Sequence, residues 1–157
     1  MSVEVQDHAP DFKAAATGDK TLTLADFAGH TLVLYFYPRD NTPGCIQEGE
    51  AFRDQYEAFR AAGAEIVGVS RDSLRKHENF RDKHGFPFDL ISDADERMCK
   101  DYDVLKEKNM YGRTHIGIER STFVIDGDGV VRNVWRGVKV ADHADEVLSA
   151  VRALETA

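Results

Sequence analysis

The chain lacks the features that mark secreted and membrane proteins. Its 157 residues include only two cysteines, Cys45 and Cys99, which are too few for a disulfide scaffold and too far apart for a zinc knuckle. No apolar run approaches the roughly 20 residues that cross a bilayer. The N-terminal segment is polar and acidic, without the basic and apolar regions of a secretory signal. We therefore expect a cytoplasmic protein with no membrane association, whose thiols serve as reagents if they have a function.

Positive charge is scarce as well. The 20 lysines and arginines are outnumbered by 28 aspartates and glutamates, so the net charge is −8. Because nucleic-acid binding normally requires a basic face, we expect no nucleic-acid partner. The six histidines show no paired metal-ligand spacing, and the Asp126-Gly-Asp-Gly129 segment lacks the later ligands of a calcium loop. We predict no metal ion, and a hairpin turn at 126–129.

What is present favours one α/β domain that spans residues 1–157. The length and the 42% content of hydrophobic residues are sufficient to close a core. The alternating order of elements predicts a mixed central sheet covered by helices on both faces. The charged stretch 106–117 has little periodicity, and we expect a surface loop there. Patterning and glycine or proline boundaries predict strands at 31–37, 64–70, 88–92, 121–125 and 130–135 and helices at 45–62, 73–84, 94–102 and 141–154.

Cys45 follows a predicted strand, a tight turn and Gly44, and it opens a predicted helix. The first turn of a helix has unpaired backbone N–H groups and a partial positive charge, which together stabilise a thiolate. We expect the pKa of Cys45 to fall below about 8.5, the ordinary value for a thiol. Since the thiolate is the efficient nucleophile, this position suits attack on a peroxide oxygen or on a disulfide. The alternative is a small buried residue that packs a helix end.

The residues around Cys45 resemble a known signature. Pro38, Thr42 and Cys45 form the Pro-x-x-x-Thr-x-x-Cys pattern of the peroxiredoxins. The sequence from Phe36 to Cys45 resembles that of their bacterioferritin comigratory protein (PrxQ) subfamily. The likeness continues in Asp11-Phe with Leu22-Thr-Leu, in Lys108-Asn-Met-Tyr-Gly112 and in the segment from Gly117 to Asp126, and so covers nearly the whole chain. It implies a thioredoxin-like fold and no cofactor. The implied activity is that of a thiol-dependent peroxidase, which reduces hydrogen peroxide and alkyl hydroperoxides in antioxidant defence through a sulfenic acid on Cys45.

The resemblance also implies roles for the neighbours of Cys45. Arg120 and the helix amides would stabilise the negative charge that grows on the departing oxygen. The hydroxyl of Thr42 can accept a hydrogen bond from the peroxide and donate toward the sulfur. Pro38, besides ending a strand, would wall the pocket against water. Gly44 and Glu48 are supporting candidates, since Glu48 could orient Arg120, although glutamate is also common near helix starts for dipole reasons.

The route by which Cys45 is reduced again stays open. Many members of the subfamily place a resolving cysteine five residues after the first, where this chain has Glu50. The internal candidate is then Cys99, which lies in a short helix on the flank of an apolar stripe, as a packing cysteine does. If Cys99 does not react, a thioredoxin-like protein or a low-molecular-weight thiol must reduce the sulfenate. The resemblance also favours a monomer.

Two other functions deserve comparison. A thioredoxin-like disulfide reductase normally uses Cys-x-x-Cys, but Thr42 and Glu48 occupy the positions three residues before and after Cys45, which disfavours that activity. A redox sensor or holdase would use the oxidation of Cys45 as a signal. Because it would need the same residues, the sequence separates it poorly from a peroxidase.

Overall fold

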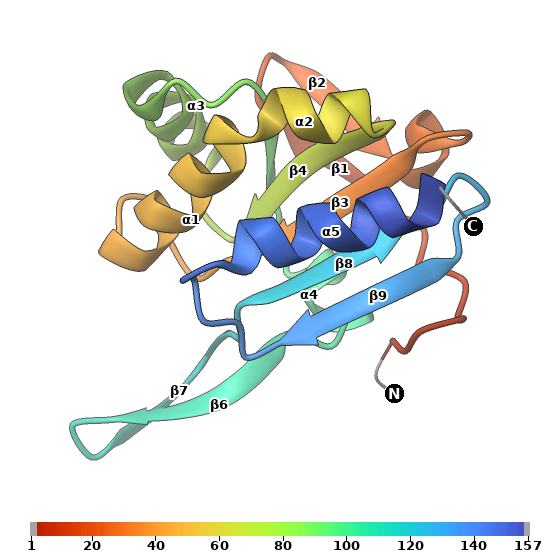
Figure 1. Cartoon of the computed structure of the whole chain (residues 1–157). Helices are drawn as coiled ribbons and strands as arrows, with labels where there is room; N and C mark the ends of the chain where they lie inside the picture. Colours follow the sequence, from red (N-terminus) through yellow and green to blue (C-terminus); the bar gives the residue numbers. More distant parts are fainter. Residues whose placement is uncertain (1–2, 156–157) are drawn as a thin grey trace.

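The computed structural model describes residues 3–155, which form a central sheet with helices packed on it (Figure 1). No helix among these residues is long and apolar enough to span a membrane. The strands are β1 (Lys13–Ala16), β2 (Lys20–Thr23), β3 (Thr31–Phe36), β4 (Ala64–Ser70), β5 (Asp89–Ser92), β6 (Leu105–Met110), β7 (Arg113–Ile118), β8 (Ser121–Ile125) and β9 (Val131–Arg136). The helices are η1 (Leu24–Phe27), α1 (Pro43–Asp54), α2 (Tyr56–Ala61), α3 (Leu74–His84), α4 (Arg97–Asp101) and α5 (His143–Glu155).

The main sheet is mixed, as the order of elements predicts. Its seven strands run β2-β1-β5-β4-β3-β8-β9. The β3–β4 and β4–β5 pairs are parallel, because α1 with α2 and then α3 carry the chain back to the start of the next strand. The β3–β8 and β8–β9 pairs are antiparallel. This arrangement places the carboxyl end of β3 beside the start of β8.

The central strand β3 is buried on both sides, and its side chains alternate between two hydrophobic clusters. Leu32, Leu34 and Phe36 belong to a cluster that we call the α4-side cluster, because it includes Met98, Cys99 and Tyr102. The intervening residues belong to what we call the α1-side cluster, on the opposite face of the sheet. Its members include Val33, Tyr35, Tyr37, Cys45, Phe52, Phe59, Phe80 and Val147.

The prediction of a surface loop at 106–117 is wrong, because this segment forms the β6–β7 hairpin. The hairpin is a separate two-stranded sheet that projects from the main body (Figure 1). Tyr111 and Gly112 connect its strands with φ of 53° and 75°, the left-handed backbone that a two-residue hairpin turn requires. Polar residues on both faces hide the alternation by which strands are recognised.

Three other expectations differ from the structure. The helix predicted at 45–62 begins at Pro43 and is interrupted at Gln55, so that α1 and α2 are separate helices. The helix predicted at 94–102 is shorter, because Glu96 adopts a left-handed conformation just before α4. Strands β1 and β2 were not expected, since alanines dominate β1 and have low strand propensity.

Candidate active site

Cys45 lies in the first turn of α1, immediately after the loop that follows β3. Thr42 is the N-cap of α1, and Pro43 occupies the first helical position, where its fixed φ suits a helix and its missing N–H costs no hydrogen bond. The backbone N–H of Ile46 is bonded to the carbonyl of Thr42, so the amides before it lack an intrahelical acceptor. The Cys45 side chain is 2% exposed and packs in the α1-side cluster. The sequence prediction of a cysteine at a helix N-terminus is confirmed.

Arg120 reaches Cys45 from a distant part of the sequence. It lies between β7 and β8, and the antiparallel register that pairs Phe36 with Ser121 brings it beside the end of β3. Its Nη2 lies 3.4 Å from the Cys45 Sγ, and its Nη1 donates to Glu48 Oε1 at 2.6 Å. One guanidinium therefore contacts both the sulfur and the carboxylate that holds it in place.

Burial and charge oppose each other at Glu48. Its side chain is 2% exposed, and burial raises the pKa of this carboxyl to about 7, although Arg120 acts to lower it. The second oxygen, Oε2, has no hydrogen-bond partner within residues 3–155. Burial also acts against the charge of Arg120, but the proximity of Glu48 and Cys45 raises the pKa of the guanidinium. Arg120 therefore remains a cation at neutral pH.

The remaining predicted residues lie in the same loop and helix start. A Cβ atom on Gly44 would lie 3.1 Å from Arg120 Nη2, so glycine at this position leaves room for the guanidinium. Thr42 is half-buried, and its hydroxyl donates to the carbonyl oxygen of Arg39 at 2.9 Å. The hydroxyl proton is therefore not directed to the sulfur, contrary to expectation, and the free capacity of Thr42 is as an acceptor. Pro38 is half-buried at the start of the loop.

Cys99 does not lie with this group. It belongs to the α4-side cluster, so the central sheet separates it from Cys45, and its side chain is fully buried. Burial first, and Asp93 second, raise the pKa of the Cys99 thiol far above its ordinary value. A disulfide requires Cα atoms within about 7 Å. A bond between the two cysteines would therefore need extensive rearrangement of the chain.

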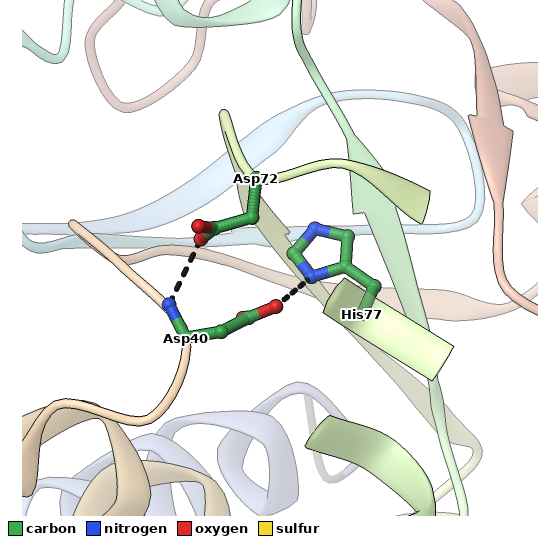
Figure 2. A group of neighbouring side chains, drawn as sticks. All are labelled: Asp40, Asp72 and His77. Carbon is green, nitrogen blue, oxygen red and sulfur yellow. Dashed lines mark hydrogen bonds and ion pairs between the residues drawn. The ribbon is translucent and has the colours of Figure 1, made fainter. Parts of the chain in front are cut away.

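The sequence did not predict a polar cluster that packs against the loop, although one of its members, Asp40, lies within the motif from Phe36 to Cys45. Figure 2 shows Asp40 from the loop after β3, Asp72 from the connection between β4 and α3, and His77 from α3. The potential ligand atoms of these three residues lie within 4.8 Å of one another, a spacing that a metal ion could use. Each residue is already hydrogen-bonded, however, with Asp40 joined to both of the others. A metal ion would have to break these bonds, which favours a hydrogen-bond network instead.

His143, at the start of α5, is buried close to the charge of Arg120. Its Nε2 lies 2.8 Å from Thr122 Oγ1, and the ring contacts the aromatic rings of Phe52 and Trp135. Burial, and to a smaller extent Arg120, lower the pKa of His143 from 6.5 to about 4. The imidazole is therefore neutral at neutral pH.

This neutral histidine predicts a loss of stability in mild acid. As the pH falls from 6.5 to about 4, the unfolded chain protonates His143 while the folded chain does not, so the free energy of unfolding decreases. The decrease reaches at most about 3 kcal/mol and is absent above the unfolded pKa. We expect His143→Gln, which can still bond to Thr122, to show a shallower decrease in urea unfolding measured over this pH range. Parallel curves for the two proteins would contradict the assignment.

The comparisons with known proteins agree with this geometry. Residues 5–134 match the AhpC/TSA family. Peroxiredoxin Bcp of Xanthomonas campestris is 53% identical over 143 residues, which cover 91% of this chain and 89% of that protein. Among solved structures, a mutant of PrxQ from Xylella fastidiosa superposes with a TM-score of 0.94 at 42% identity over 99% of both chains.

A further structural relative is described by its chemistry. The bacterioferritin comigratory protein of Xanthomonas campestris, described in terms of its alkyl peroxide reduction activity and a trapped intermediate, has a TM-score of 0.89 at 50% identity over 97% of both chains. These similarities confirm the predicted thioredoxin-like fold class and the resemblance found in the sequence. The chain therefore belongs to the AhpC/TSA family, as a peroxiredoxin of the Bcp (PrxQ) group.

Proposed function

We propose that this peroxiredoxin reduces hydrogen peroxide and alkyl hydroperoxides, with Cys45 as the residue that attacks the peroxide. The observation that carries the proposal is the contact of 3.4 Å between Arg120 Nη2 and the Cys45 sulfur. The Arg120 guanidinium and the N-terminus of α1 both lie at the sulfur that would attack the peroxide. The alkyl peroxide activity named for the Xanthomonas relative supports organic hydroperoxides as substrates.

The reaction is a displacement at oxygen. The Cys45 thiolate attacks one peroxide oxygen, the S–O bond forms as the O–O bond breaks, and the departing RO⁻ takes up a proton to become an alcohol, or water when R is hydrogen. The sulfur is oxidised by two electrons to a sulfenic acid, and the peroxide is reduced by two. Arg120 and the free amides of α1 stabilise the charge on the departing oxygen. Thr42, whose own proton is bonded to Arg39, accepts a hydrogen bond from the peroxide.

The other site residues act through these groups. Glu48 orients Arg120 by the hydrogen bond to Nη1. Gly44 leaves room for the guanidinium, and Pro38 limits the access of water to the sulfenic acid. Each of these roles depends on the position of Arg120 or of the loop, so the loop geometry decides the rate of the chemical step.

Reduction of the sulfenic acid is assigned to an external thiol. Cys99 lies on the opposite face of the sheet and is protonated, so it is a structural residue in this proposal. A thiolate from a thioredoxin-like protein or a small thiol attacks the sulfenic sulfur and displaces hydroxide, which takes up a proton to become water. A second thiol then releases Cys45 from the mixed disulfide. We place this activity in a monomeric, single-domain protein of the cytoplasm that serves antioxidant defence.

Mass spectrometry after stoichiometric oxidation tests the proposed function. We expect one equivalent of hydrogen peroxide to add one oxygen atom to Cys45, which a sulfenate-specific reagent such as dimedone traps, with no internal disulfide. Excess dithiothreitol is expected to support repeated turnover. Oxidation at Cys99 alone would contradict the assignment of the site. A single oxidation of Cys45 without turnover would favour a redox sensor.

A further inference from the structure

The loop that carries the Cys45 motif rests on the buried cluster shown in Figure 2. Asp40 is 5% exposed and His77 is fully buried. One oxygen of the Asp40 carboxylate accepts a hydrogen bond from the Tyr37 hydroxyl at 2.6 Å, and the other lies 2.6 Å from His77 Nδ1. On its other side, His77 Nε2 lies 2.9 Å from the carbonyl oxygen of Ile91 in β5. The cluster therefore ties the loop to α3 and to the sheet.

Hydrogen-bond directions specify how this cluster works. The carbonyl oxygen of Ile91 can only accept, so His77 must donate from Nε2. The 2.6 Å contact between Nδ1 and the Asp40 carboxyl group then needs a second hydrogen atom, carried either by Nδ1 or by the carboxyl group. An amide in place of the carboxylate would satisfy the same contacts, because its oxygen accepts from Tyr37 and its N–H donates to a neutral His77. The pair thus has a conservative replacement that keeps the geometry.

One peptide group links this cluster to Thr42. The N–H of Asp40 donates to Asp72 Oδ2 at 2.8 Å, and Asp72 is itself held by the Ser70 hydroxyl. The carbonyl of the same peptide group, that of Arg39, accepts the hydroxyl proton of Thr42 at 2.9 Å. Since a peptide group is planar, any interaction that sets the direction of its N–H also sets the direction of its carbonyl.

We propose that Asp40, His77 and Asp72 are positioning residues that orient the Arg39–Asp40 peptide group, so that Thr42 presents its lone pairs to the peroxide. The inference rests on the proposed function, because it assigns the cluster to the peroxide-binding step. Among residues 3–155, the structure records no contact between these three side chains and the Cys45 sulfur. Its loss is therefore expected to impair the reaction with peroxide much more than the general reactivity of the thiol.

Two rates measured on the same variants separate these effects. We expect Asp40→Ala to lower the rate constant for Cys45 oxidation by hydrogen peroxide about 10- to 100-fold, as misplacement of a reacting partner does. Alkylation of Cys45 by iodoacetamide, which needs no acceptor at Thr42, is expected to stay near the wild-type rate. Asp40→Asn is expected to restore the peroxide rate. In a Thr42→Val background, Asp40→Ala is expected to add little further loss.

The controls address folding and the site itself. Tyr102→Phe, in the α4-side cluster, removes a hydroxyl that donates to the carbonyl oxygen of Pro10, and it is expected to leave both rates unchanged. If Asp40→Ala does not fold, Asp72→Ala removes the acceptor for the same N–H from a less buried position, with the same selective loss expected. A folded variant with the wild-type peroxide rate, or with equal losses in both rates, would overturn the inference and leave the proposed function intact. A wild type that reacts no faster with peroxide than an ordinary thiol would overturn both.

Discussion

Cys45→Ser is expected to lower peroxide consumption by at least about 1000-fold, as removal of an attacking nucleophile does in other enzymes. A serine hydroxyl is not ionised at neutral pH, and its oxygen cannot form the stable oxidised product that sulfur forms. Arg120 and the α1 N-terminus remain in place in this variant, so the loss measures the sulfur itself. Peroxide consumption under excess dithiothreitol, followed over time, gives the rate.

Cys99→Ser is the matched control for this experiment, because it makes the same atomic change in the other cluster. Cys99 is buried on the opposite face of the sheet, and we expect its replacement to keep the wild-type rate while lowering stability modestly. Undiminished turnover in Cys45→Ser would refute the mechanism. A loss of turnover in Cys99→Ser when a thioredoxin-like protein is the reductant, but not when dithiothreitol is, would instead make Cys99 the resolving residue.

Arg120→Met is expected to lower the rate constant for peroxide by about 100- to 1000-fold, the effect of removing a donor that stabilises developing negative charge. The variant also removes the interaction that lowers the pKa of Glu48, so that this carboxyl becomes protonated at neutral pH. Arg120→Lys is expected to recover little, since one ammonium cannot contact both the sulfur and Glu48 as the guanidinium does. Stopped-flow mixing with excess peroxide measures these constants.

Glu48→Gln tests whether the glutamate acts through Arg120. The amide oxygen can still accept from Arg120 Nη1, so we expect a smaller loss of rate than in Arg120→Met. In the Arg120→Met background, Glu48→Gln is expected to change the rate little, because the group that it orients is absent. A large loss in that background would show that Glu48 contacts the substrate directly.

Local sequence features determined much of what the structure contains. The strands at 64–70 and 121–125 are rich in β-branched and apolar residues, and both are found where predicted. Ser73 and Gly85 bound α3 as a side-chain N-cap and a left-handed C-cap. The position of Cys45 at a helix N-terminus follows in the same way from a strand, a proline-containing turn and a helix in sequence order.

The partners of Cys45 were decided by tertiary structure. Arg120 is 75 residues away, and the β3–β8 register alone brings it to the sulfur. The sequence suggested Arg120 through resemblance, whereas its contact distance depends on strand pairing. The contact between Asp40 and His77 likewise joins residues 37 positions apart, and no local sequence pattern around either residue predicts the contact.

The separation of the two cysteines also shows which features follow from local sequence and which depend on tertiary structure. Helical periodicity already placed Cys99 beside an apolar stripe, as a packing residue would be, but that pattern does not distinguish between the two faces of a sheet. The face of the sheet on which Cys99 lies depends on the connection from β5, which places α4 in the same cluster as Leu34 and Phe36, on the side opposite α1. Local propensity acts through neighbours in the chain, and it determined the elements and the position of the nucleophile. Which side chains meet across the sheet depends on strand order, register and crossover, and these are properties of the whole fold.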